Sequence, residues 1–121
     1  MVYATKEDYL KYYTVVPENF DRFAESASRN IDILTFNRIV STGWENLTDY
    51  QRSTIIECTC EIIQFMDDNI DVLDSVLSSY SINGVSMQFK FNPTIFIQNG
   101  IVMRQSTYGQ LMSTGLCYRG I

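Results

Sequence analysis

The feature that most constrains the fold is a stripe of apolar residues between positions 20 and 34. Its members recur at spacings of three and four residues: Phe20, Phe23, Ala24, Ala27, Ile31 and Leu34. This spacing matches the period of the α-helix, so it predicts an amphipathic helix of about four turns with charged residues on the opposite face. Pro17 suits the first turn of that helix. The stripe has to be covered, and the chain therefore needs further helices to pack against it.

The longest predicted helix begins after Thr48, which is a suitable N-cap. Gln51, three residues later, completes a capping-box pattern. The apolar residues that follow occupy much of the helix circumference: Ile55, Ile56, Cys58, Ile62, Ile63, Phe65 and Met66. Such a helix belongs at the centre of a bundle or touches two neighbours. The acidic pair Asp67-Asp68 opposes the helix dipole, so we expect the helix to fray near Asn69.

Two shorter helices complete the predicted helical content. Thr5 resembles an N-cap with an acidic residue in the first turn, which favours a helix over residues 5–14 with Tyr9, Leu10 and Tyr13 on its apolar side. A second short helix is predicted over residues 101–113, ended by Gly115. Thr42-Gly43 separates the two long helices.

The apolar period changes from 3.6 to 2 around residue 80, which predicts a β-hairpin. Asn83-Gly84 lies between two alternating runs and suits a tight turn, because both turn positions need positive φ. The alternating apolar residues are Tyr80, Ile82, Val85, Met87, Phe89 and Phe91. An isolated two-stranded hairpin is marginal in water, so this one needs support from the helices or from another subunit. Residues 94–97 suit a strand that continues the hairpin, and the role of residues 92–104 is otherwise open.

These patterns define the expected fold class. We predict a mainly α protein, a small bundle of three to four helices with a β-hairpin inserted near residues 79–91, in a single domain spanning residues 1–121. No apolar run approaches the ~20 residues that span a bilayer, and the first residues lack the order of a signal peptide. We therefore expect a cytosolic protein at synthesis, without membrane contact.

The residues that usually carry chemistry are scarce. The chain has no histidine, which removes the commonest general acid and base and the commonest metal ligand. Cys58, Cys60 and Cys117 form no framework pattern and are expected to be free, buried thiols. An EF-hand loop starting at Asp67 fails at its sixth and twelfth positions, and no phosphate-binding glycine loop occurs. We expect no catalytic residues, no metal and no cofactor.

Charge is unevenly distributed along the chain, whose net charge is −5. Residues 41–80 carry one basic residue, Arg52, against eight acidic ones, whereas residues 81–121 carry three basic residues and no acidic one. The split suits self-association, with the basic end of one copy facing the acidic middle of the next. A solvated acidic helix face explains it equally well. The negative net charge disfavours nucleic-acid binding through a basic patch.

Several short stretches, taken in order, resemble the head–tail connector (adaptor) proteins of long-tailed bacteriophages. They cover residues 27–32 (ASRNID), 35–39 (TFNRI), 47–51 (LTDYQ), 78–87 (SSYSINGVSM) and 113–116 (STGL). The resemblance implies a structural virion protein of the neck, and no enzyme. It implies a ring, usually of twelve copies, between the portal protein and the stopper or tail-completion protein, with DNA passing through the lumen.

The same resemblance suggests where partners would bind. The hairpin would contact a neighbouring subunit or the stopper, and the C-terminal tail would clasp the portal or an adjacent copy. The expected interface residues are Tyr80, Ile82, Asn83, Gly84, Val85, Met87, Phe89, Leu116, Cys117, Tyr118 and Arg119. The acidic middle of the chain would line the lumen and let DNA slide. Two alternatives remain open, a small helical DNA-binding protein and a small enzyme of unknown type.

Overall fold

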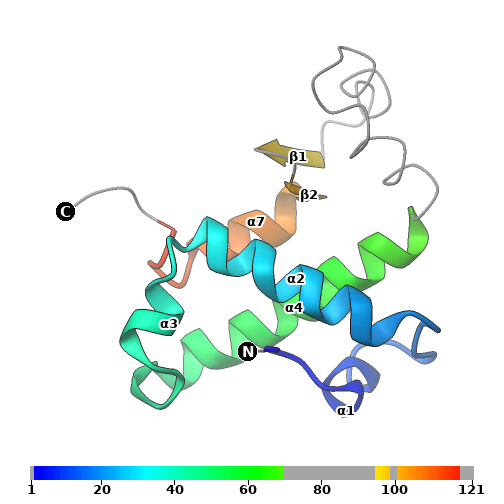
Figure 1. The fold of residues 1–121 in the computed structure, drawn as a ribbon, viewed down its shortest axis with the longest axis horizontal. Coiled ribbons are helices and arrows are strands. Elements are labelled where there is room, and N and C mark those ends of the chain that lie inside the picture. The colour runs from blue at the N-terminus through cyan, green and yellow to red at the C-terminus, as the bar shows by residue number, and fades with distance from the viewer. Residues whose placement is uncertain (1, 70–94, 99–100, 118–121) are drawn as a thin grey trace.

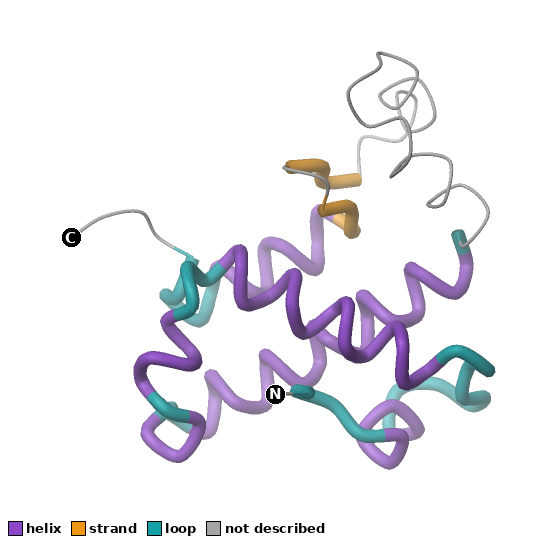
Figure 2. Tube along the Cα trace, viewed as in Figure 1, coloured by secondary structure: helices purple, strands orange, loops and turns teal. Residues whose placement is uncertain are grey.

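The computed structural model describes residues 2–69, 95–98 and 101–117. It is mainly helical (Figures 1 and 2). The elements run α1 (Lys6–Leu10), α2 (Phe20–Leu34), α3 (Arg38–Thr42), the 3-10 helix η1 (Trp44–Asn46), α4 (Asp49–Asp68), β1 (Ile95–Gln98), β2 (Ile101–Arg104) and α7 (Gln105–Met112). The described residues thus include five α-helices, one more than the upper limit of our prediction, because α3 forms a separate turn after α2.

The stripe on α2 is the core face of that helix, as predicted. All six of its members are buried, and Ala27 and Ile31 are fully shielded from solvent. The start of the helix differs from the prediction. Pro17 lies outside α2, whose N-cap is Asn19, and the Pro17 carbonyl instead accepts a hydrogen bond from the Phe20 amide (3.1 Å). Pro17 therefore shapes the turn before the helix.

Helix α4 is the centre of the bundle. Thr48 caps it and forms the predicted capping box with Gln51. The helix contacts α1, α2, α7 and β2, which explains why its apolar residues surround so much of its circumference. It ends at Asp68, and the Asn69 amide donates to the Phe65 carbonyl (3.1 Å).

The first helix is shorter than predicted. The Thr5–Asp8 capping box starts α1 as expected, but the helix ends at Leu10 and not near residue 14. Thr14, Val15 and Val16 are β-branched, and a residue before proline disfavours the helical region, so this segment resists helix formation. Leu10 consequently points outward and is 51% exposed, whereas Tyr9 is fully buried.

The predicted helix over residues 101–113 was wrong in its first turn. Ile101–Arg104 forms β2, which pairs antiparallel with β1 in the register Ile97↔Val102, and α7 begins only at Gln105. Ile101, Val102 and Met103 are all buried. Pairing with β1 therefore makes this apolar run a strand, although we predicted a helix for it. The strand predicted over residues 94–97 corresponds to β1. The hairpin predicted near residues 79–91 lies outside the described residues.

Candidate interaction surfaces

Of the predicted interface residues, the structure describes Leu116 and Cys117. Both belong to the segment after α7, residues 113–117, which we call the C-terminal segment. The other predicted interface residues lie outside the described ranges: Tyr80, Ile82, Asn83, Gly84, Val85, Met87, Phe89, Tyr118 and Arg119. The structure therefore bears only on the Leu116 and Cys117 part of the predicted interface.

Two long side chains tie the C-terminal segment to the helical body. Arg38 Nη1, on α3, donates a hydrogen bond to the Leu116 carbonyl (2.9 Å). Gln51 Nε2, in the first turn of α4, donates to the Thr114 carbonyl (3.0 Å). Each bond satisfies a backbone carbonyl that would otherwise lack a hydrogen-bond partner in a part-buried site.

Side chains of the C-terminal segment complete this attachment. The Ser113 hydroxyl lies 2.6 Å from the Tyr50 hydroxyl, and Leu116 is buried against the core. Gly115 supplies the positive φ (+78°) that reverses the chain direction after α7. The segment is therefore a fixed part of the body as far as Cys117.

Cys58 and Cys60 are fully buried, as predicted, whereas Cys117 is only partly buried. Burial raises the pKa of the Cys117 thiol to about 11, and the nearby Arg38 charge opposes this rise only in part. Burial also raises the pKa values of Cys58 and Cys60, that of Cys60 to about 12. The reactive thiolate form is therefore disfavoured at all three positions.

Among the described residues nine large apolar side chains are exposed: four lie between Val2 and Val15, and five lie farther along the chain. These five come from α2, α3, the corner between them, and the near ends of α4 and α7, and we call them the tail-end surface: Ile33, Phe36, Val40, Tyr50 and Met112. Each is about half exposed or more. Sequence reasoning missed this surface. The available signal was that Ile33 lies on α2 but outside its apolar stripe.

Phe36 has the most unusual backbone of the tail-end surface. It adopts φ of 56°, followed by Asn37 at 59°, and it is the only aromatic residue with positive φ in the described part of the chain. Hydrogen bonds from the Asn37 amide to the Asp32 carbonyl (2.8 Å) and from the Arg38 amide to the Thr35 carbonyl (3.0 Å) hold the corner. The Arg38 guanidinium lies 4.9 Å from the Phe36 ring centroid, a cation–π distance.

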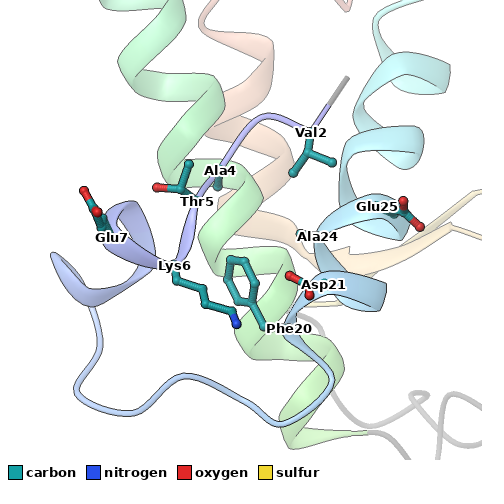
Figure 3. Close-up of a pocket in the computed structure, with 9 residues that line it drawn as sticks. All are labelled: Val2, Ala4, Thr5, Lys6, Glu7, Phe20, Asp21, Ala24 and Glu25. Carbon is teal, nitrogen blue, oxygen red and sulfur yellow. The ribbon is translucent and has the colours of Figure 1, made fainter.

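A groove lies at the other end of α2, between that helix and the N-terminal segment. It has a volume of about 630 Å³ and we call it the N-terminal groove. Figure 3 shows Val2, Ala4, Thr5, Lys6 and Glu7 on one side and Phe20, Asp21, Ala24 and Glu25 of α2 on the other.

The N-terminal groove has an apolar floor and a charged rim. Ala4, Phe20 and Ala24 are almost fully buried and form the floor. The charged residues around them are Lys6, Glu7, Asp21 and Glu25, which carry one positive and three negative charges. The rim is therefore acidic overall.

The wall of this groove is held in place by Tyr3. The Tyr3 amide donates to Ser28 Oγ (3.1 Å), and the Tyr3 hydroxyl donates to the Asp32 carboxylate. The Tyr3 ring also stacks on Trp44, with 5.5 Å between ring centroids. Burial, followed by the bond to Asp32, raises the pKa of Tyr3 above its ordinary value. The groove is thus formed before any partner binds.

Two acidic residues of α4, Glu61 and Asp68, have contacts with side chains of the body. Thr107 Oγ1 donates to Glu61 (2.7 Å), and Gln64 Nε2 donates to Asp68 (2.7 Å). Arg104 lies 4.0 Å from Asp68. Within residues 2–69, 95–98 and 101–117, no three cysteine or acidic side chains come together as a metal site. In the same ranges, every helix is too short or too polar to cross a bilayer.

Comparison with known proteins identified no relative. No protein-family model matches the chain, and neither a curated protein nor a solved structure is significantly similar to it.

Proposed function

We propose that the chain is a structural head–tail adaptor of a long-tailed bacteriophage and has no catalytic activity. Copies of it would form a ring between the portal and the stopper, in the neck of the virion, with DNA passing through the lumen. In this role the protein needs several contact surfaces and no reactive centre.

One observation carries the proposal: three of the segments that resemble adaptor proteins meet at one end of the fold. Arg38 from residues 35–39 bonds to Leu116, and Gln51 from residues 47–51 bonds to Thr114, both in residues 113–116. Segments separated by more than 60 residues are thus joined directly. Direct contact between these segments in the folded chain supports the proposal that they form one functional end.

The tail-end surface supports the same role. Tyr50, one of its exposed side chains, is hydrogen-bonded to Ser113 of the C-terminal segment, which we propose as the part that clasps the portal or an adjacent copy. Exposed apolar side chains beside such a segment suit a protein contact. The predicted hairpin residues, Tyr80 to Phe89, remain the proposed contact with a neighbouring subunit or the stopper.

The test is the mass of the purified chain by light scattering, alone and after mixing with portal rings from the phage that encodes it. We expect co-migration at one copy per portal subunit. A Val40→Lys/Met112→Lys variant should lose this binding, because it places two charges on the tail-end surface. A Tyr12→Lys variant, altered at an exposed aromatic residue outside that surface, should retain it.

Absence of binding to an intact portal would refute the adaptor role. Retention of the chain on DNA at low salt, with a steep loss as salt rises, would instead favour the DNA-binding alternative. Turnover of a substrate by the purified chain would contradict the absence of catalytic activity.

A further inference from the structure

We draw no further inference here: the strongest candidate, the N-terminal groove between α2 and residues 2–7, has an acidic rim over a floor that is already buried, and nothing in the described part of the structure shows what would occupy it.

Discussion

Two isoleucines on α2 provide a direct test of the packing on which both surfaces depend. Ile31 belongs to the buried stripe and is fully shielded from solvent, whereas Ile33 belongs to the tail-end surface and is 50% exposed. The same substitution, isoleucine to alanine, should therefore have very different effects at positions that are two residues apart on one helix.

The expected loss at Ile31 follows from its burial. Alanine lacks three of the isoleucine side-chain carbons, which contribute roughly 2.4 kcal/mol at about 0.8 kcal/mol each. The cavity left behind adds to this, so the free energy of unfolding should fall by about 2–5 kcal/mol. At Ile33 about half of the transfer energy is at stake, and the higher helix propensity of alanine offsets part of it. The net loss there should stay below about 1 kcal/mol.

Urea unfolding and thermal melts followed by circular dichroism measure both variants. Ile31→Ala should lower the urea midpoint at an unchanged slope, and should lower the melting temperature by roughly 10 °C in a domain of this size. Ile33→Ala should melt within a few degrees of wild type. Equal losses in the two variants would refute the assignment of buried and exposed faces on α2.

Three further predictions concern named groups of the body. Gln51→Glu keeps an acceptor for the capping box but removes the hydrogen-bond donor to the Thr114 carbonyl. Amide hydrogen exchange across residues 113–117 should therefore become about tenfold faster. Unchanged exchange would contradict the role of Gln51 in holding the C-terminal segment. Burial raises the pKa of Tyr9 from 10.0 to about 12, which means that folding favours its neutral form. The free energy of unfolding should therefore hold below pH 10 and fall as pH rises from about 10 through 12. Urea midpoints over this range should decline less steeply in the Tyr9→Phe variant. Burial raises the pKa of Cys60 to about 12 and that of Cys117 to about 11. A thiol reagent at about pH 8 should therefore react slowly with the folded chain, and first at Cys117. Rapid labelling of Cys60 would contradict its burial.

The parts of the fold that depend on residues close together in the sequence were predictable from the sequence. The α2 stripe, the N-cap at Thr5 and the capping box at Thr48 are local patterns, and the structure confirms each of them. The central position of α4 was also predictable, because a helix with so wide an apolar surface has few other places to lie.

The errors arose where distant contacts decide the conformation. Ile101 to Met103 form a short apolar run that suits a buried helix or a buried strand equally well by its pattern. Pairing with Ile95–Gln98 makes it a strand, a choice that the β-branched Ile101 and Val102 favour. The left-handed backbone of Phe36 has a local origin instead, in the hydrogen-bonded turn over residues 32–38.

The candidate surfaces were the least predictable part, for a related reason. Helical periodicity identifies the residues that face the core. An apolar residue outside the stripe only weakens the match to this periodicity and does not by itself indicate a binding surface. Ile33, Phe36 and Val40 are of this kind, and folding does not bury them. Each remains about half exposed or more, so its hydrophobic stabilisation is at best partly realised in the single chain. A second copy or another partner would supply the rest, and residues that a helical pattern leaves unexplained are therefore the first to test for binding.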